Sequence, residues 1–457
     1  MKKVFTLIIA LPVAFAGFSQ SCLPEGITFT TQAQVDSFQI NYPNCTEVEG
    51  NLYINNLWHG TDITNLDGLI VLKSIGGTLL IETNNYLVSI TGLINLHSVG
   101  GALYIEENNA LTSLSGLDSL SSVGGLVISW SEGLTNLTGL ESLDSIYGDF
   151  IFEFNHHLTN LTGLDNLTSI EGNVRINNNN LINFTGLESL NSIGGNVYIH
   201  HGHGLVSLTG LNNLISIGGY LHFFSNYSLT NLMGLDNLRS IGGYLEIVGN
   251  GGLIGLSGLD SLDSIGGQLK IGMNGALTSL EALSNLKVIG SNLVVFQENA
   301  LASLTGLDNI DAESIVDLYL TNNPILSTCD IQSVCDYLAN PNGVILLYGN
   351  AAGCASQQEL EAACGVGLDE SNTQETHINI YPRPATTAIT ISLPSTTPIY
   401  NTVLSIYNVN AQQVISRLIT ESITVLDISK LPGGVYFVRI TDDRAVRVGK
   451  FVKTLGL

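Results

Sequence analysis

The sequence predicts a mainly β protein: one long solenoid of stacked coils, followed by a small antiparallel β-sandwich. Three observations lead to this fold class. The dipeptide Gly-Leu returns at intervals of 23 or 24 residues through the middle of the chain. Leucines and isoleucines within each interval are spaced by two residues and then by three. The C-terminal segment shows short runs of alternating apolar and polar residues instead.

The N-terminus has the composition of a cleavable secretory signal peptide. Lys2 and Lys3 precede the apolar stretch Val4–Ala16, and small and polar residues follow as far as Gln20. Cleavage after Ala16 and cleavage after Gln20 both fit, and we prefer the second, which gives a signal peptide at 1–20. A lipoprotein signal would acylate Cys22, but the aliphatic residue expected three positions earlier is missing. No later segment has about 18 uninterrupted apolar residues, so no transmembrane segment is expected after signal removal.

Two glycine landmarks define the repeat. Such a fixed period is typical of a solenoid, whose units are too small to fold alone and stack on their neighbours. The Gly-Leu glycines are Gly68, Gly92, Gly116, Gly139, Gly163, Gly186, Gly210, Gly234, Gly258 and Gly306, with Ala282 in the missing slot. Gly-Gly pairs begin at Gly76, Gly100, Gly124, Gly194, Gly218, Gly242 and Gly266.

One unit illustrates the expected coil. Its apolar positions are Leu103, Ile105, Leu111, Leu114, Leu117, Leu120 and Val123. The first step of two residues predicts a strand with alternate side chains buried. The later steps of three fit short 3₁₀-like or extended sides that return one residue in three to the core. We interpret the Gly-Gly pair as a corner that needs backbone angles closed to other residues.

Asparagines recur three residues after the second buried strand position. A side-chain amide at the same corner of successive coils can bond backbone groups that a turning chain leaves unpaired. We therefore predict a buried structural ladder. Its members are Asn84, Asn108, Asn155, Asn179, Asn226, Asn250, Asn274 and Asn323.

These residues carry a resemblance to a known superfamily. The Leu-x-Ile-x-x-Asn core resembles the leucine-rich-repeat signature, and Leu232 to Leu245 is similar to the repeat of receptor L-domains. The resemblance covers residues 48–323. It implies a right-handed leucine-rich-repeat, L-domain-like solenoid of about 11–12 coils with a parallel sheet on one side. It does not identify a ligand, because such folds carry many functions.

The six cysteines flank the repeats. An even number in an exported chain favours disulfides over a zinc site, and no Cys-x-x-Cys pair occurs. Cys22 with Cys45 is the natural N-terminal pair, in a cap at 21–47. Three pairings remain open for the other four, in a cap at 324–364 where Asp330–Leu338 and Gln357–Ala363 are expected to be helical. These four are Cys329, Cys335, Cys354 and Cys364.

The outward face of the predicted sheet is the candidate binding surface. Side chains between the buried strand positions point outward, and they form a column from Tyr53 to Tyr319. Aromatic residues there are informative because tyrosine exposes apolar area with a polar group. The candidate ligand-binding residues, on three adjacent strands, are Tyr198, Tyr220, His222, Phe224 and Tyr244. Aromatic residues also fit sheets for structural reasons, or a loop could cover them.

Other site classes have less support. Two histidine clusters, His156-His157 and His200-His201-Gly202-His203 with His222 one strand away, are compatible with a metal site. We favour solvent-facing side chains and predict no metal and no cofactor. No nucleophile with its base, catalytic carboxylate pair or phosphate-binding loop stands out. We therefore expect no enzyme. The net charge of −24 argues against nucleic acid as a partner.

A polar linker is expected at 365–376, and the last domain at 377–457. Seven short strands predict a small β-sandwich there: Ile378–Tyr381, Ala388–Leu393, Thr402–Tyr407, Gln413–Ile419, Ser422–Asp427, Gly434–Thr441 and Arg444–Val452. The segment resembles the C-terminal sorting domain of the type IX secretion system through an ordered set of residues. The set is Tyr381, Pro382, Pro384, Tyr407, Gly434, Tyr436 and Lys450. Arg383 and Asn410–Gln412 depart from the usual Asn and Gly-Gln of that family. A generic adhesive sandwich is the alternative.

This resemblance implies handling by the export and sorting machinery of the outer membrane, and removal of the domain on delivery. The sequence therefore predicts a secreted or cell-surface recognition protein without enzymatic activity, which binds a protein or glycan through the outward sheet face. A structural spacer of the cell envelope is the alternative function.

Overall fold

The computed structural model describes residues 20–55, 60–177, 179–366, 378–393, 399, 402–442 and 446–454. They belong to two compact units, Met1–Val366 and Gly367–Leu457. The predicted signal peptide lies outside the described residues except for Gln20, and so does the predicted linker except for Gly365 and Val366.

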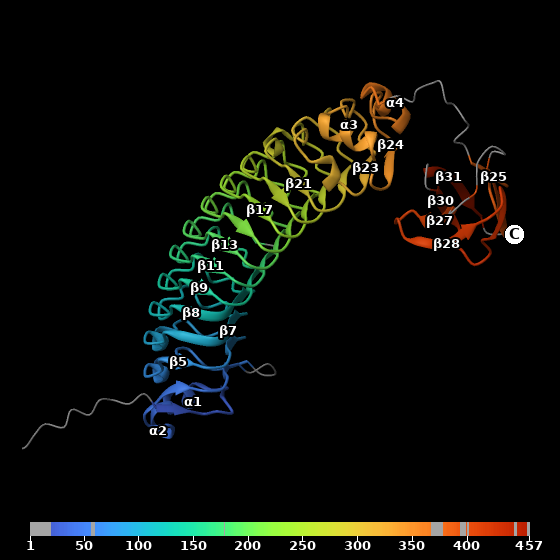
Figure 1. Cartoon of the computed structure of the whole chain (residues 1–457). Coiled ribbons are helices and arrows are strands. Elements are labelled where there is room, and N and C mark those ends of the chain that lie inside the picture. The colour runs from blue at the N-terminus through green and yellow to red at the C-terminus, as the bar shows by residue number, and fades with distance from the viewer. Residues whose placement is uncertain are drawn as a thin grey trace, which may run out of the picture. The chain divides into compact units, whose positions relative to one another are not determined.

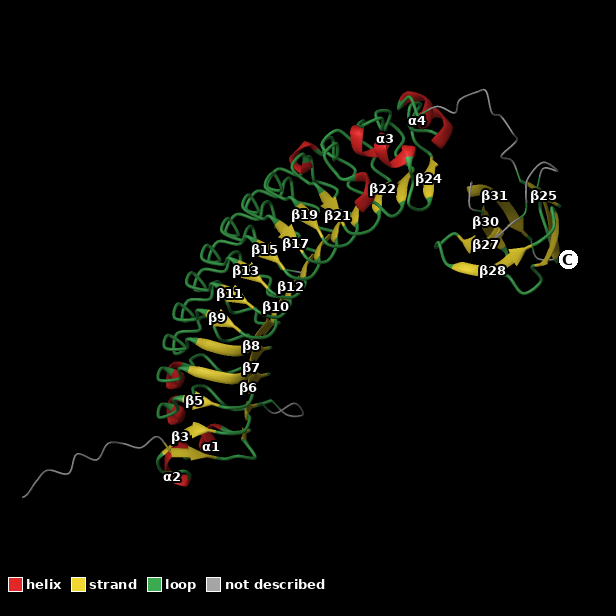
Figure 2. Ribbon diagram, in the orientation of Figure 1, coloured by secondary structure: helices red, strands yellow, loops and turns green. Residues whose placement is uncertain are grey.

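The first unit is a parallel β-solenoid of about 13 turns, which confirms the predicted fold class (Figure 1). Its strands form two ladders, and β7 and β8 run through both. The long ladder follows the concave side of the curved stack, and the connecting turns follow the convex side (Figure 2). The sequence predicted a sheet on one side, so the second ladder is an addition from the structure.

The long ladder consists of β2 (Ile27–Phe29), β4 (Leu52–Ile54), β6 (Leu79–Glu82), β7 (Ser98–Glu106), β8 (Ser122–Ser129), β10 (Phe150–Glu153), β12 (Val174–Asn177), β14 (Val197–His200), β16 (Leu221–Phe224), β18 (Leu245–Val248), β20 (Leu269–Gly272), β22 (Leu293–Phe296), β23 (Leu318–Thr321) and β24 (Ile345–Tyr348). Besides the first residues of β7 and β8, the short ladder consists of β1 (Gln20–Cys22), β3 (Cys45–Val48), β5 (Ser74–Ile75), β9 (Ser145–Ile146), β11 (Ser169–Ile170), β13 (Ser192–Ile193), β15 (Ser216–Ile217), β17 (Ser240–Ile241), β19 (Ser264–Ile265) and β21 (Val288–Ile289).

A single apolar core runs through the turns of this unit. All seven apolar positions of the unit that begins at Leu103 are fully buried. The three-residue steps are tight turns, and four of them are 3₁₀ helices: η1 (Asp67–Leu69), η2 (Thr91–Leu93), η3 (Glu281–Leu283) and η4 (Ala312–Ser314). A small apolar void of about 10 Å³ lies near the middle of this core, among Phe184, Leu211 and their neighbours.

The two glycine landmarks have different physical causes. The Gly-Leu glycine adopts a positive φ in most turns, for example 114° at Gly163 and 110° at Gly258. The Gly-Gly pairs do not have positive φ, so our interpretation of them was wrong. A Cβ on Gly100 would overlap the carbonyl oxygen of Gly76 in the preceding turn. The Gly-Gly pair is therefore required by close backbone stacking between turns.

The predicted asparagine ladder is buried and hydrogen-bonded. Asn250 is typical: its Oδ1 accepts from the backbone N–H of Asn226 at 3.0 Å, and its Nδ2 donates to the carbonyl oxygen of Phe223 at 3.2 Å. In three of the turns that the structure describes in full, Ser131, Gly202 and Glu298 stand in place of the asparagine. The ladder thus satisfies buried main-chain groups at one corner of successive turns.

Disulfides close both ends of the solenoid, as predicted. Cys22 pairs with Cys45 near α1 (Gln32–Asp36) and α2 (Phe38–Asn41), two short helices that the sequence analysis did not anticipate. At the other end Cys329 pairs with Cys354, and Cys335 with Cys364. The predicted helices of this cap are α3 (Gln332–Ala339) and α4 (Gln357–Ala363).

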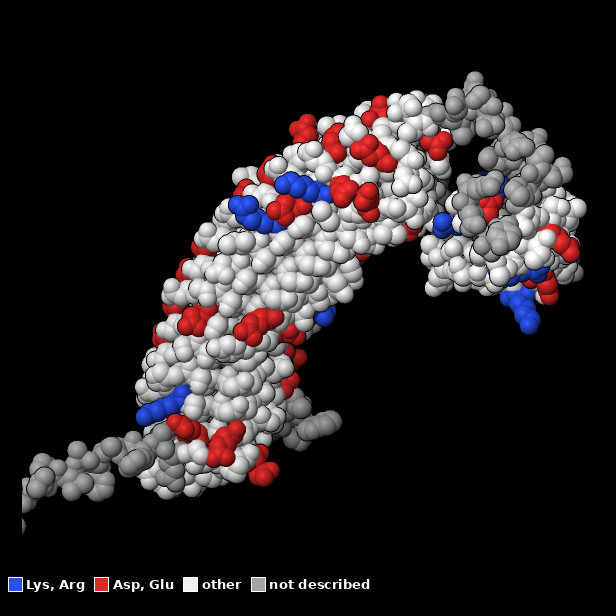
Figure 3. All heavy atoms as spheres, viewed as in Figure 1, with Lys and Arg blue, Asp and Glu red and all other residues white. Residues whose placement is uncertain are grey.

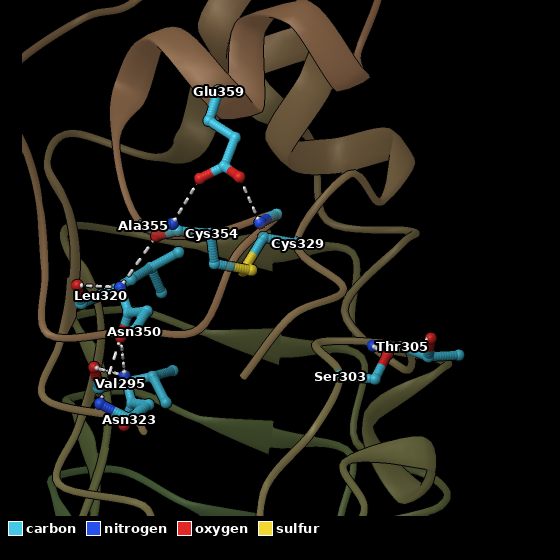
Figure 4. Close-up of a disulfide and its surroundings, with 11 residues drawn as sticks. Val295, Ser303, Thr305, Leu320, Asn323, Cys329, Asn350, Cys354, Ala355 and Glu359 are labelled. Carbon is cyan, nitrogen blue, oxygen red and sulfur yellow. Dashed lines mark hydrogen bonds between the residues drawn. A yellow bond between two sulfur atoms is a disulfide. The ribbon is translucent and has the colours of Figure 1, made fainter. Parts of the chain in front are cut away.

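The C-terminal cap continues the asparagine ladder (Figure 4). Asn350 accepts the amide of Asn323 at 3.0 Å and donates to the carbonyl oxygens of Leu320 and Cys354, at 2.8 and 3.1 Å. Glu359 of α4 accepts the N–H of Ala355 at 3.2 Å. The disulfide between Cys329 and Cys354 is therefore tied to the last rung of the ladder.

The second unit is a pair of antiparallel sheets around one core, as predicted. One sheet contains β25 (Asn379–Tyr381), β26 (Ala388–Ser392) and β29 (Ile423–Asp427). The other contains, in spatial order, β28 (Gln413–Ile419), β27 (Thr402–Asn408), β30 (Gly434–Thr441) and β31 (Val446–Lys453).

Charge is distributed unevenly along the chain. Residues 377–457 contain eight Lys or Arg and four Asp or Glu, whereas residues 20–366 contain five Lys or Arg in all. Acidic side chains accordingly outnumber basic ones on the face of the solenoid in Figure 3. Among the described helices, none is long and apolar enough to cross a membrane.

Candidate functional site

Strands β14, β16 and β18 build the candidate site on the outward face of the long ladder. In β14, Val197 and Ile199 are buried while Tyr198 and His200 lie outward and are half-buried. The same alternation places His222 and Phe224 outward on β16. The strands pair in register, so Tyr198 lies beside His222, and His200 beside Phe224.

Four of these side chains form one cluster of rings. His200 is its centre: its ring centroid lies 5.7 Å from that of Tyr198, 4.7 Å from that of His222 and 5.9 Å from that of Phe224. All three contacts are edge-to-face, the geometry that aromatic rings favour. We call Tyr198, His200, His222 and Phe224 the ring cluster.

Tyr220 and Tyr244 form a second group at the start of β16 and β18. Their rings are stacked, with centroids 3.8 Å apart and planes inclined by 10°. The hydroxyl interaction with Tyr220, reinforced by partial desolvation, raises the pKa of Tyr244 to about 12. The phenol of Tyr244 is therefore a neutral hydrogen-bonding group near neutral pH.

A polar chain extends from the ring cluster along the face. His200 Nε2 lies 3.2 Å from His222 Nδ1, and His222 Nε2 lies 3.6 Å from a carboxylate oxygen of Glu246. Lys270 lies 3.5 Å from Glu246, and Gln268 donates to the same carboxylate at 2.8 Å. The carboxylate of Glu246 is thus compensated inside the site.

The two histidines are held neutral. Burial, with His222 as the next contribution, lowers the pKa of His200 to about 4. Burial also lowers the pKa of His222, and Glu246 opposes that shift. On the other side of the cluster, Arg175 pairs with Glu153 at 2.5 Å. The site is therefore a nearly uncharged aromatic surface on an acidic molecule.

The other histidine pair has a structural partner. His156 Nδ1 lies 2.6 Å from Glu132, and His157 lies 3.4 Å from the same carboxylate. No group of three or more His, Cys, Asp or Glu side chains suited to a metal ion is found within the described residues.

The short ladder carries a shallow groove of about 850 Å³. Serines, isoleucines and glycines that recur once per turn line it, from Ser169 to Gly290. Because this lining is repetitive and mostly uncharged, the groove has few groups that could distinguish one ligand from another.

Three residues were absent from the predicted set of ligand-binding residues. His200 and Glu246 connect the predicted residues, and Trp130 stacks on Phe154 three turns away, with centroids 4.2 Å apart. The in-register alternation indicated the positions of His200 and Glu246. Trp130 stands at the corner that follows β8, where φ is positive, and strand alternation does not reach that position.

The residues of the predicted sorting set lie in the second unit. Tyr381, Pro382 and Pro384 are exposed at the end of β25. Tyr436 is buried, stacks on Phe451 at 5.4 Å and donates its hydroxyl hydrogen to the carbonyl oxygen of Pro432 at 2.9 Å. The remaining members are Tyr407, half-buried on β27, Gly434, exposed at the start of β30, and Lys450, exposed on β31.

Residues 379–454 match the family described as the Secretion system C-terminal sorting domain. The match confirms the predicted sorting domain and does not extend to the solenoid. No curated protein matches the chain in sequence.

The chain is thus an exported protein with a type IX sorting tail, delivered to the cell surface or the extracellular space.

Proposed function

We propose that the solenoid is a recognition module of the leucine-rich-repeat, receptor L-domain type, which binds an extracellular protein or glycan through the outward face of its long ladder. An N-terminal signal peptide would direct the chain to export, and the sorting tail would carry it across the outer membrane. The module would have no catalytic activity.

One observation carries this proposal: the ring cluster and the stacked pair Tyr220–Tyr244 share one outward face of three adjacent strands. A fold needs no ring contacts on its solvent side, whereas binding surfaces are enriched in tyrosine and other aromatic residues. The compensated charges at Glu246 and Glu153 lower the cost of desolvating this surface.

The chemistry of the face favours binding over catalysis. His200 and His222 are neutral and contact each other, and neither contacts a Ser, Thr or Cys side chain in the described residues. A nucleophile activated by a base needs that contact. The polar groups can still bind hydroxyl, amide or carbonyl groups of a ligand.

A spacer function is the second candidate. Its support is the continuous core of the stack and the disulfides at both ends, which give a long rigid body. In that case the outward face would have no ligand.

Substitution of the site separates the two functions. The intact chain and its Tyr198→Ala, His222→Ala and Tyr244→Ala variants would be applied to glycan and protein arrays. Tyr227→Ala is the matched control, because Tyr227 is 59% exposed and lies off this face. Recognition predicts that at least one ligand is lost with the three variants and kept with the control, at unchanged circular dichroism. If all three variants bind every ligand of the parent chain with unchanged affinity, the spacer function is supported instead.

A further inference from the structure

Trp130 is a large aromatic side chain on the solvent side of the fold. It follows β8 at a corner with φ 52°, and 48% of its surface is exposed. Its indole stacks on the ring of Phe154, with planes inclined by only 11°. Phe154 belongs to the next turn, so one face of the indole is covered by the protein itself.

The opposite face of the indole lies toward the preceding turn. Glu107 occupies the same corner there, because the N–H of Glu107 bonds to Ser129 and the N–H of Trp130 bonds to Glu153 in an identical pattern. Glu107 is exposed, and the hydroxyl of Thr83 donates to its carboxylate at 3.3 Å. Glu107 is therefore the corner residue that borders Trp130 on the side away from Phe154.

A second carboxylate flanks this position. Glu106, at the end of β7, accepts the hydroxyl of the buried Ser129 at 2.7 Å, and Ser129 directly precedes Trp130. None of the ion pairs among the described residues includes Glu106 or Glu107, and Arg175, three strands away from Glu106, is bound to Glu153. Among the described residues, the cation–π contact is that of Lys270 with the ring of Phe296.

We propose that Trp130, with Glu107 and Glu106, binds the cationic side chain of an arginine or lysine from a partner protein. A cation over the face of a tryptophan is stabilised by the ring quadrupole, and a planar guanidinium can stack on the indole while it bonds to a carboxylate. The excess of acidic residues in the solenoid steers a basic segment toward this face.

This site extends the proposed function and does not depend on the ring cluster. The ring cluster is compensated in charge and suits an uncharged ligand, whereas the Trp130 site has uncompensated carboxylates. A basic segment is therefore favoured over a neutral glycan at Trp130.

The chain has two tryptophans, so the variant Trp58→Phe makes Trp130 the only indole reporter. In this intact chain, an acetylated hexaarginine peptide should quench Trp130 fluorescence in a saturable manner at low salt. The isosteric hexacitrulline peptide and a neutral glucose hexasaccharide are the uncharged probes. Raising the salt concentration should weaken the arginine interaction, because the carboxylates contribute to it.

Calorimetry with the same peptide tests the residues. Trp130→Ala and Glu107→Gln should each weaken binding by roughly fivefold or more, as expected for the loss of a cation–π or charge contact. Met273→Ala controls for the corner, because Met273 has φ 59° and is 50% exposed. Glu171→Gln controls for net charge, and both controls should leave the affinity unchanged.

Three results would overturn the proposal: equal quenching by the citrulline peptide, tighter binding of the hexasaccharide, or a Glu107→Gln effect no larger than that of Glu171→Gln. The variants Tyr198→Ala and His222→Ala should bind the arginine peptide normally. A negative result in the ring-cluster experiment would therefore not contradict the Trp130 site, and a negative result at Trp130 would not contradict the ring cluster.

Discussion

The carboxyl group of Glu298 accepts both the backbone N–H and the side-chain amide of Asn274, at 3.0 and 2.9 Å. In most neighbouring turns an asparagine carbonyl holds this position. The second oxygen, Oε2, is buried and has no hydrogen-bond partner. Burial raises the pKa of Glu298 to about 8, although the hydrogen bonds from Asn274 oppose the shift.

Glu298 should make the solenoid less stable at alkaline pH. The pKa of this carboxyl is higher in the folded state than its unfolded value of 4.5. Its contribution to the free energy of unfolding is therefore complete below the unfolded pKa, and it is lost as the pH rises toward the folded pKa. Each tenfold difference in proton affinity corresponds to about 1.4 kcal/mol. Glu298→Gln should therefore gain stability relative to the parent chain between pH 5 and 8.5, by an amount on the order of a few kcal/mol.

The measurement is urea unfolding at several pH values. Glu171→Gln is the control, because Glu171 is exposed. The other acidic residues also make the free energy of unfolding depend on pH, but they do so equally in the parent chain and in Glu298→Gln. Identical pH slopes for both proteins would refute this role of Glu298.

Loss of one asparagine rung should destabilise the whole stack. Asn250→Ala removes the acceptor of Asn226 and the donor to Phe223, and leaves these buried groups unpaired. Each unpaired buried group costs about 1–3 kcal/mol, so we expect a loss of about 3 kcal/mol. The control is Asn180→Ala, because Asn180 is exposed and lies outside the ladder. This substitution should change the free energy of unfolding little. Equal urea midpoints for both variants would argue against the ladder as a stabilising element.

Gly258 and Gly255 form a matched pair for the turn. Gly258 has φ 110°, and a Cβ there would overlap the carbonyl oxygen of Leu232. Gly255 has no atom within 4 Å of a Cβ and no positive φ. Gly258→Ala should cost more than about 2 kcal/mol, from backbone strain together with the clash. Gly255→Ala should be neutral within error in thermal unfolding, and a comparable loss in the two variants would contradict this account.

The turn between β27 and β28 contains a strained alanine. Ala411 has φ 56°, and Asn408 caps the turn by accepting the N–H groups of Asn410 and Gln412, at 3.0 Å each. A left-handed conformation costs a non-glycine residue about 1–2 kcal/mol. Ala411→Gly should therefore raise the unfolding temperature of the C-terminal unit by a few degrees in calorimetry, without change in the solenoid transition. A lower unfolding temperature would show that chain entropy outweighs the strain.

Sequence periodicity was sufficient to predict the coil and its ladder of amides. The step of two from Leu103 to Ile105 gave the long ladder, and the seven strands of the tail agree closely in position with the structure. The short ladder was missed because its strands are mostly two residues long, as at Ser74–Ile75, and are hidden among the three-residue steps. The Gly-Gly pairs were misinterpreted because a sequence does not distinguish backbone strain from close contact between turns.

The candidate site was predictable only where strand geometry applies. Alternation and register place Tyr198 beside His222 and indicate that Phe224 shares their face. The rotation of the rings is set by side-chain packing, so the contacts of His200 and the neutral state of both histidines required coordinates. Trp130 lies beyond the last strand residue, and its stacking on Phe154 depends on a corner that no two-residue pattern describes.

The disulfides at the two ends also determine where the stack can open. In a linear array a terminal turn has a single neighbour and would fray first, but covalent links hold both termini of this one. Local opening should then begin in the interior, near Gly202, which supplies no side-chain amide, and near the void beside Phe184 and Leu211. This stretch borders the ring cluster, so a ligand bound there should also oppose the opening of these turns.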